Sequence, residues 1–202
     1  MKKILAIGAH PDDIEFGAGG TIASHSRKGH KVFFLVLTAG EAGGQADIRK
    51  KEALESSKKL GVSRLIFLDF RDTRIEYNYE TIKAIEDIID EIKPDRIYTH
   101  CEKDKHQDHR NTALASITAS RNSKQVLSYE SPSTYPTFHP QFFVKLSDEI
   151  MELKISALEC YKSQSKKEYM KIEAFKGLAR FRGLQSGNKY AEAFEVIRYV
   201  EE

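Results

Sequence analysis

Two polar clusters in this sequence combine imidazole and carboxylate side chains at short spacing. The first is His10-Pro11-Asp12-Asp13, and the second is His106-Gln107-Asp108-His109. Imidazole nitrogens and carboxylate oxygens are ligands that a zinc-type ion prefers, and any side chains left over can act as acids or bases beside it. Together the two clusters indicate a metal-dependent catalytic site.

Each cluster alone has a simpler explanation. Pro11 fixes the backbone of a polar turn, and Asp12 or Asp13 could cap a following helix. A lone His-x-x-His is more often a solvated loop than a metal site. The conjunction favours a site because each cluster follows an apolar, strand-like run, at residues 4–9 and 95–100.

Apolar runs typical of buried strands alternate with helical patterns along the chain. The strand-like runs lie at residues 4–9, 32–37, 65–68, 95–100, 126–127 and 142–144, and the helical patterns at 17–28, 48–60, 79–92 and 111–120. After Pro140 two further helices, 150–161 and 166–184, and a late strand at 190–200 are expected. This succession predicts a single α/β domain over residues 1–202, Rossmann-like and three-layered, with a mostly parallel sheet.

The expected strand order explains how the two clusters could meet. In the common order 3-2-1-4-5, the first and fourth strands are neighbours and the order reverses between them. Ligands of such sheets bind in the crevice beyond the carboxyl ends of the strands at this point. We therefore expect one site built from both clusters.

Composition excludes several classes of partner. The net charge is +2 and the lysines are scattered, which argues against a nucleic-acid binder. No run approaches the about 18 apolar residues that a membrane helix needs. Cys101 and Cys160 are too few for a disulfide framework, which favours a cytoplasmic location.

With both clusters in view, the sequence resembles the LmbE-like (PIG-L-like) zinc-dependent N-deacetylases. Matching segments occur in the family's order across nearly the whole chain. They are Ala9-His10-Pro11-Asp12-Asp13, Thr38-Ala39-Gly40-Glu41 with Arg49 and Glu52, His106-Gln107-Asp108-His109, Tyr161-Lys162-Ser163-Gln164 and Tyr190-Ala191-Glu192-Ala193-Phe194.

The resemblance implies a role for each residue of the two clusters. His10, Asp13 and His109 become the metal ligands, a three-ligand set with an open water position that suits Zn²⁺, with Fe²⁺ as the alternative. Asp12 becomes the general base, and His106 the group that stabilises the oxyanion and protonates the amine.

Asp108 and two more distant residues have competing explanations. Asp108 could orient His106 and raise the pKa of that imidazole, or cap the helix that starts near Arg110, and the two roles are compatible. Arg49 matches a substrate-binding arginine of the family, although alone it would be taken for an exposed helix charge. Tyr190 resembles a tyrosine near the family's pocket, although tyrosine is also a common packing residue in strands.

The implied reaction removes the N-acetyl group from an N-acetylglucosamine-type sugar or its conjugate. The substrate is expected to be a small molecule, and the sequence does not specify the group that is joined to the sugar. We expect a homo-oligomer, with interface surface from about residue 150 onward. The alternatives are a metal-stabilised nucleotide- or sugar-binding module and a cysteine hydrolase using Cys101 with His106. A glycine-rich phosphate loop is missing, which disfavours nucleotide binding. In the deacetylase interpretation, neither His139 nor Cys101 is assigned a role.

Overall fold

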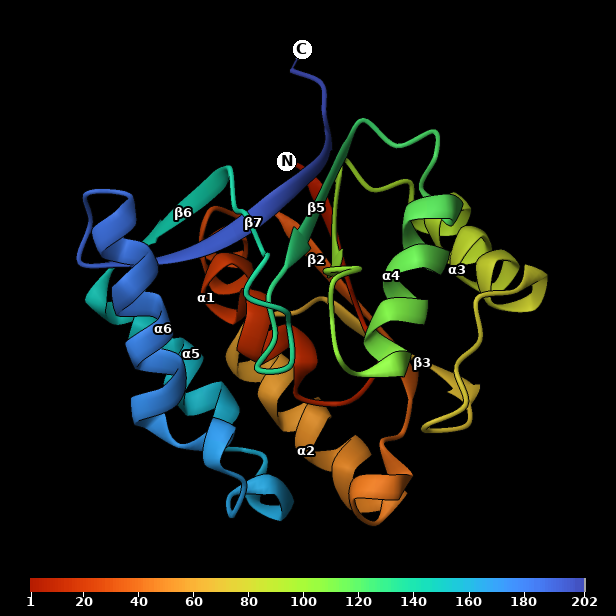
Figure 1. The fold of residues 1–202 in the computed structure, drawn as a ribbon, viewed down its shortest axis with the longest axis horizontal. Coiled ribbons are helices and arrows are strands. Elements are labelled where there is room, and N and C mark those ends of the chain that lie inside the picture. The colour runs from red at the N-terminus through yellow and green to blue at the C-terminus, as the bar shows by residue number, and fades with distance from the viewer. Residues whose placement is uncertain (202) are drawn as a thin grey trace.

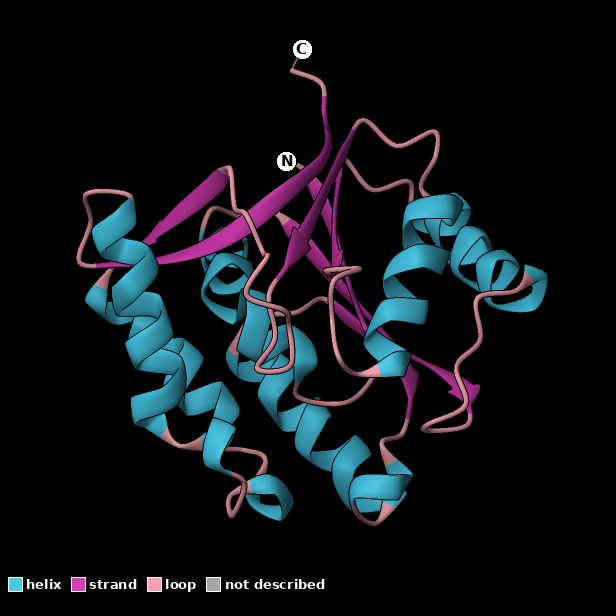
Figure 2. Ribbon diagram, in the orientation of Figure 1, coloured by secondary structure: helices cyan, strands magenta, loops and turns pink. Residues whose placement is uncertain are grey.

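A seven-stranded sheet forms the centre of the molecule, with strand order β3-β2-β1-β4-β5-β7-β6 (Figures 1 and 2). The computed structural model describes residues 1–201. The strands are β1 Lys3–Gly8, β2 Lys31–Thr38, β3 Arg64–Phe70, β4 Arg96–His100, β5 Gln125–Tyr129, β6 Phe142–Leu146 and β7 Tyr190–Tyr199. The first five strands pair in parallel, and β7 pairs antiparallel with both β5 and β6. The predicted order of the first five strands and the mostly parallel sheet are confirmed.

Helices cover both faces of the sheet, which confirms the three-layered α/β prediction (Figure 1). The helices are α1 Asp13–Arg27, α2 Ala46–Lys59, α3 Tyr79–Ile92, α4 Gln107–Ala119, α5 Asp148–Leu158 and α6 Ile172–Gln185, with short 3₁₀ turns η1 Glu41–Gly43, η2 Lys162–Gln164 and η3 Glu168–Met170. Helices α3 and α4 lie on one face, and α1, α2, α5 and α6 lie on the other side. Within the described residues, no helix combines the length and apolar character needed to cross a membrane.

The central strand β1 shows why its sequence is an unbroken apolar run. Ile4 and Ala6 pack in the core beneath α1, whereas Leu5 and Ile7 pack in the core beneath α3 and α4. Successive side chains of a strand point to opposite faces, so a strand with helices on both sides must be apolar at every position. The end of β1 is therefore held rigidly where the first polar cluster begins.

Two helices begin earlier than the apolar pattern predicts, and both begin inside the polar clusters. Helix α1 starts at Asp13 rather than near residue 17, and α4 starts at Gln107 rather than near residue 111. The N-cap of α4 is His106, whose Nδ1 accepts a hydrogen bond from the Asp108 amide at 3.2 Å. Asp108 is therefore not the N-cap of α4, and the prediction that it could cap this helix is wrong. Apolar periodicity missed these first turns because both carry buried polar residues, Asp13 and Glu15 in α1 and Asp108 and His109 in α4.

The late part of the chain also departs from the predicted boundaries. The expected helix over 166–184 is divided, because η3 precedes a helix that starts only at Ile172. Helix α5 ends at Leu158, three residues before the predicted end. The late strand is confirmed as β7, which inserts between β5 and β6.

Gly17 allows α1 to lie directly on the sheet. A Cβ at this position would lie 2.2 Å from the Tyr129 ring, which is fully buried at the end of β5. A Cβ at Gly19 would instead meet Lys154 at 3.5 Å, an ordinary contact. A side chain at position 19 can therefore be accommodated, whereas a side chain at position 17 would clash with Tyr129.

We expect Gly17→Ala to lower the free energy of unfolding by about 1–3 kcal/mol, because the added methyl must displace the Tyr129 ring in a packed core. Gly19→Ala is the matched control and should raise stability by roughly 0.5–1 kcal/mol through helix propensity. Urea unfolding followed by far-UV circular dichroism measures both. Equal effects of the two substitutions would show that α1 does not rest closely on β5.

Candidate active site

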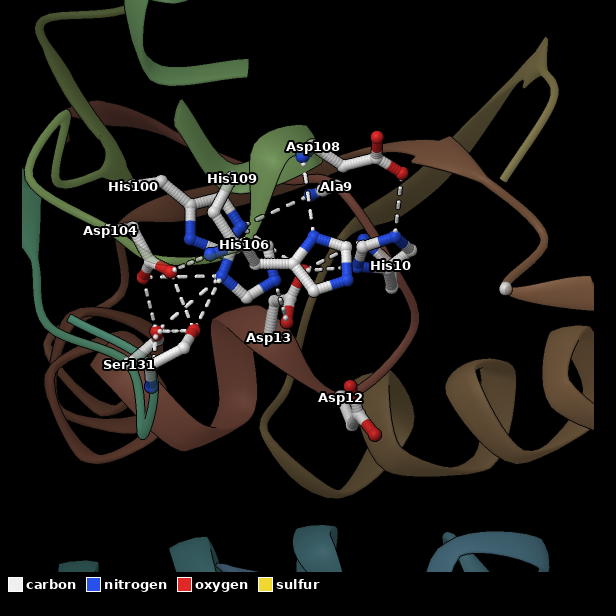
Figure 3. Close-up of polar contacts among 12 residues, drawn as sticks. Ala9, His10, Asp12, Asp13, His100, Asp104, His106, Asp108, His109 and Ser131 are labelled. Atoms are coloured by element: carbon white, nitrogen blue, oxygen red, sulfur yellow. Dashed lines mark hydrogen bonds and ion pairs between the residues drawn. The ribbon is translucent and has the colours of Figure 1, made fainter. Parts of the chain in front are cut away.

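The two polar clusters meet beyond the carboxyl ends of the neighbouring strands β1 and β4 (Figure 3). His10 Nδ1 lies 3.3 Å from Asp13 Oδ2, and His109 Nε2 lies 3.3 Å from Asp13 Oδ1. One ligand atom from each of these three buried residues lies within 4.8 Å of the other two. Two imidazoles and a carboxylate at this separation fit a divalent ion of the zinc or iron type.

The charge state of Asp13 suits a metal ligand. Burial works against the ionised form, but the nearby His109 and His100 imidazoles hold the pKa of Asp13 well below its usual range. Asp13 Oδ2 also accepts a hydrogen bond from the His10 amide at 2.7 Å. Its carboxylate is therefore ionised and fixed in position before any ion binds.

Carboxylates outside the ligand set hold the outward nitrogens of both imidazoles. His109 Nδ1 lies 3.2 Å from Asp104 Oδ2, while His10 Nε2 lies 3.0 Å from Asp72 Oδ1 and 3.1 Å from Asp108 Oδ2. Metal-binding histidines usually have such a partner, which fixes the tautomer and leaves the other nitrogen free to coordinate. The arrangement is a second reason why this site fits a metal.

Asp104 has the most complete hydrogen-bond shell of these carboxylates. It is fully buried and accepts hydrogen bonds at 2.5 Å from the hydroxyls of both Ser131 and Ser133, and one at 2.8 Å from the His106 amide. Although burial opposes ionisation, the hydrogen bond with His109 keeps the pKa of Asp104 below its usual value. Asp104 could not be assigned from the sequence, because the serine hydroxyls that hold it come from a loop more than twenty residues further along the chain.

His100 is a further buried residue that the sequence analysis did not assign. It ends β4, its Nε2 lies 3.0 Å from Asp13 Oδ2, and its ring stacks on His109 with centroids 4.1 Å apart. Burial lowers the pKa of His100 to about 4, so the ring is neutral. In the sequence, the feature that could have indicated a role for His100 in the site is its position at the end of a buried strand, shortly before the second cluster.

Asp12 is adjacent to the ligand set without being part of it. It lies immediately before α1 with φ 97°, a conformation that costs energy for any residue except glycine. Burial raises the pKa of Asp12 to about 7, even though the Arg49 guanidinium lies 3.2 Å from its Oδ2 and opposes the shift. A carboxylate with a pKa near neutrality is suited to accept a proton at physiological pH.

Arg49 is buried rather than an exposed helix charge. It is only 3% exposed, donates hydrogen bonds to the carbonyls of Pro11 and Gly40, and pairs with Asp12. The structure therefore brings Arg49 into the pocket, as the family resemblance implied and as the residue pattern alone did not.

The expected pairing of Asp108 with His106 is wrong. The Asp108 carboxylate contacts His10 and accepts the Thr73 amide at 2.7 Å, whereas His106 receives only the backbone amide of Asp108. Burial, with the imidazoles of His109 and His10, lowers the pKa of His106 instead of raising it. The first turn of α4 causes this difference, because it directs residues two positions apart to different sides.

The expected place of Tyr190 in the pocket is also wrong. Tyr190 packs in an apolar cluster with Phe16 and Leu146 at the start of β7. The pocket contains Tyr169 of η3 instead, whose hydroxyl lies 3.5 Å from Asp12 Oδ2. No periodic pattern marks Tyr169, since η3 is a short irregular turn.

A pocket of about 430 Å³ opens over these residues. It is lined by His10, Asp12, Asp13, Phe16, Ala42, Gly43, Arg49, Asp72, Thr73, His106, His109, Ser131, Pro132, Ser133, Lys167 and Tyr169. Its volume lies in the range of small-molecule sites. The cavity therefore combines a metal-type ligand set, a separate base and an aromatic wall of Phe16 and Tyr169.

Cys101 and His139 lie outside this pocket lining. The Cys101 thiol is buried 3.4 Å from Glu195 Oε2, and burial raises its pKa to about 12. A thiol that stays protonated is a poor nucleophile, so the cysteine-hydrolase alternative has no support. The His139 amide donates to Glu195 at 2.7 Å.

Comparison with known proteins identifies the family. The profile described as PIG-L, GlcNAc-PI de-N-acetylase, matches residues 5–120, which include both clusters and Arg49. The chain belongs to the PIG-L family.

Two relatives of this PIG-L chain match over most of its length. The "Uncharacterized deacetylase YaiS" of Escherichia coli (strain K12) is 42% identical over 80% of this chain and 91% of its own. The "Diacetylchitobiose deacetylase" of Thermococcus kodakarensis is 30% identical over 99% of this chain and 84% of its own. Among solved structures, N,N'-diacetylchitobiose deacetylase from Pyrococcus horikoshii superposes with a TM-score of 0.87 at 28% identity, covering 97% of this chain and 84% of that one.

We expect Asp104→Asn to weaken metal binding by about 10- to 100-fold, because the neutral amide no longer fixes the His109 tautomer or adds negative charge behind it. Competition with a chromophoric chelator measures this affinity, and far-UV circular dichroism checks the fold. Glu102→Gln is the control, since Glu102 is exposed two residues away. Unchanged affinity in Asp104→Asn would contradict this role of Asp104.

Proposed function

We propose that this protein is a metal-dependent hydrolase that removes the N-acetyl group from an N-acetylglucosamine-type sugar or its conjugate. The observation that carries the proposal is a buried set of two imidazoles and a carboxylate beside a separate carboxylate, Asp12, in one pocket. The matched PIG-L profile and the deacetylase relatives support the same reaction class.

His10, Asp13 and His109 would hold the metal, for which we propose Zn²⁺, with Fe²⁺ as the alternative that the same ligand types accept. When bound, this ion supplies Lewis-acid polarisation of the acetamide carbonyl and lowers the pKa of water at the site. In the neutral form of each ring, the carboxylate behind it would hold the proton on the outward nitrogen, so that the other nitrogen would coordinate the ion.

Asp12 is proposed as the general base. Its pKa near 7 lets a substantial fraction ionise at neutral pH and still accept a proton from the attacking water. Arg49 holds Asp12 Oδ2 from one side and fixes the carboxylate orientation. A module that only bound sugar would not need a buried acid with φ 97° next to its ligand set, which favours the enzyme over the non-catalytic alternative.

His106 is proposed to act on the oxygen of the substrate carbonyl. Its Nδ1 accepts the Asp108 amide, so in the neutral ring the proton is on Nε2. His106 can therefore donate a hydrogen bond to the developing oxyanion without first becoming an imidazolium. The departing amine then receives the proton that Asp12 removed from water, and acetate and a free amino sugar are released.

The substrate is proposed to be a small molecule, and no nucleic-acid partner is expected. The cytoplasmic location and assembly into a homo-oligomer stay predictions. Phe181 and Leu184 support the second of these, because both are more than half exposed on α6 in the late part of the chain.

The adjacent aspartates provide a sharp test of the assigned roles. We expect Asp12→Asn to keep its metal but lose about 10²–10⁴ in kcat, because the amide cannot accept the proton. Asp13→Ala should lose the metal itself. Metal content by mass spectrometry and amine release from N,N'-diacetylchitobiose measure the two effects, and each variant is the control for the other. Near-normal kcat in Asp12→Asn would exclude Asp12 as the base.

Chelation and alkylation separate the metal enzyme from a cysteine hydrolase. Treatment with 1,10-phenanthroline should abolish amine release, and added Zn²⁺ should restore it, because the reaction depends on the ion. Iodoacetamide should leave activity intact, since Cys101 and Cys160 are buried thiols with raised pKa values. Loss of activity on alkylation, together with resistance to the chelator, would reverse the assignment.

A further inference from the structure

Thr73 is held in the left-handed region of backbone conformation, with φ 67°. It lies in the turn between β3 and α3, which is closed by a hydrogen bond of 3.1 Å from the Arg74 amide to the Arg71 carbonyl. A side chain branched at Cβ is strained in this region, and a turn position with positive φ usually holds glycine or asparagine. Threonine therefore destabilises a turn that glycine would form without strain.

The backbone of Thr73 explains the shape of the turn but not the choice of residue. Its amide donates to Asp108 Oδ2 at 2.7 Å, and its carbonyl accepts a hydrogen bond from Gln107 Nε2 at 2.8 Å. Both bonds attach the turn to the first turn of α4. Glycine would supply the same amide and the same carbonyl, so these contacts do not require a threonine.

The side chain of Thr73 is a free polar group on the wall of the catalytic pocket. Thr73 is exposed and lines the pocket, and within residues 1–201 its hydroxyl forms no hydrogen bond with the chain. The preceding Asp72 differs, because its two oxygens are engaged by His10 Nε2 at 3.0 Å and by the Ala42 amide at 2.9 Å. The strained side chain thus supports no contact within the described chain, and strain of this kind is typical of residues that act on a ligand.

Two other residues with a side chain have a positive φ, and each has a separate explanation. Asp12, with φ 97°, is the proposed base in the same pocket. Lys93, with φ 51°, follows the last turn of α3, where helices commonly adopt this conformation, and it lies outside the pocket lining. Thr73 is therefore the strained residue whose side chain still needs a reason.

We propose that Thr73 is a specificity-determining residue of the deacetylase, whose hydroxyl forms a hydrogen bond with a hydroxyl of the amino sugar. This proposal rests on the deacetylase function proposed above. A threonine hydroxyl both donates and accepts, as a sugar hydroxyl does, so the contact needs no charge on either partner. The backbone bonds of Thr73 to α4 fix the turn, so its hydroxyl is positioned before the sugar binds.

The test uses neutral probes that differ by single hydroxyls. They are methyl N-acetylglucosaminide, which is the parent probe, and its 3-deoxy, 4-deoxy and 6-deoxy analogues. Amine release gives kcat and KM for each probe, with the full chain loaded with metal. Thr73→Val removes the hydroxyl of the protein and keeps the branched shape, whereas Thr73→Ser keeps the hydroxyl.

We expect Thr73→Val to raise the KM of the parent probe about three- to tenfold, the range for one hydrogen bond, with little change in kcat. The increase should disappear for the deoxy probe that lacks the partner hydroxyl, because that probe cannot form the bond with either protein. Thr73→Ser should keep the KM of the parent probe close to that of the unaltered protein. The deoxy probe without an increase identifies the sugar hydroxyl that Thr73 binds.

Stability measurements separate a side chain that binds substrate from one that supports the fold. We expect Thr73→Gly to raise the urea midpoint of unfolding, because glycine adopts a positive φ without strain, and to raise KM as Thr73→Val does. Lys93→Gly is the matched control. It relieves a positive φ outside the pocket, so it should raise the midpoint and leave KM unchanged.

The proposal is overturned if the probes are hydrolysed and Thr73→Val leaves every KM unchanged, or raises all four KM values equally. It is also overturned if Thr73→Gly lowers the urea midpoint, because the side chain would then stabilise the turn. If none of the probes, nor N,N'-diacetylchitobiose, releases amine with the unaltered protein, the deacetylase function itself fails, and the contact of Thr73 with the sugar fails with it.

Discussion

The ionised carboxylate of Asp13 is the group around which the site is built. A buried charge is tolerated only when it is paired and hydrogen-bonded, because it has left water. Asp13 meets this requirement with the His10 amide at 2.7 Å, His100 at 3.0 Å and His109 at 3.3 Å. These partners come from the end of β1, the end of β4 and the first turn of α4. One carboxylate therefore fixes the relative positions of three segments at the switch point of the sheet.

A second layer of carboxylates extends this constraint outward. Asp72 and Asp108 hold His10, and Asp104 holds His109. Each imidazole is thereby oriented from behind by charge and from the front by Asp13, so its coordinating nitrogen has little freedom to turn. Preorganisation of this kind reduces the free energy that must be spent on ordering the ligands when an ion binds.

The late segments of the chain complete the site by fixing α1 and the outer wall. Glu192 of β7 accepts the amides of Gly20 and Thr21 at 2.9 and 2.6 Å, in the middle of α1. Tyr161 donates to the buried Glu15 at 2.6 Å, in the first turn of the same helix. These contacts give a physical reason for the residue types in the late motifs that resemble the family. They hold the helix that begins at Asp13, the proposed ligand, directly after Asp12, the proposed base.

The sequence by itself determined the strands, the order of the parallel sheet and the meeting of the two polar clusters, because apolar runs and polar strand ends are local signals. The residues proposed as metal ligands and base lie within those clusters, and the resemblance to the family is what divided the roles among them. Tertiary structure alone decided that Asp108 faces His10 rather than His106, that His100 and Asp104 support the ligands, and that Tyr169 reaches the pocket. The contacts of Asp108, His100 and Tyr169, and those of Asp104 with the loop that carries Ser131 and Ser133, join elements distant in the sequence. Periodicity along the chain carries no record of that packing.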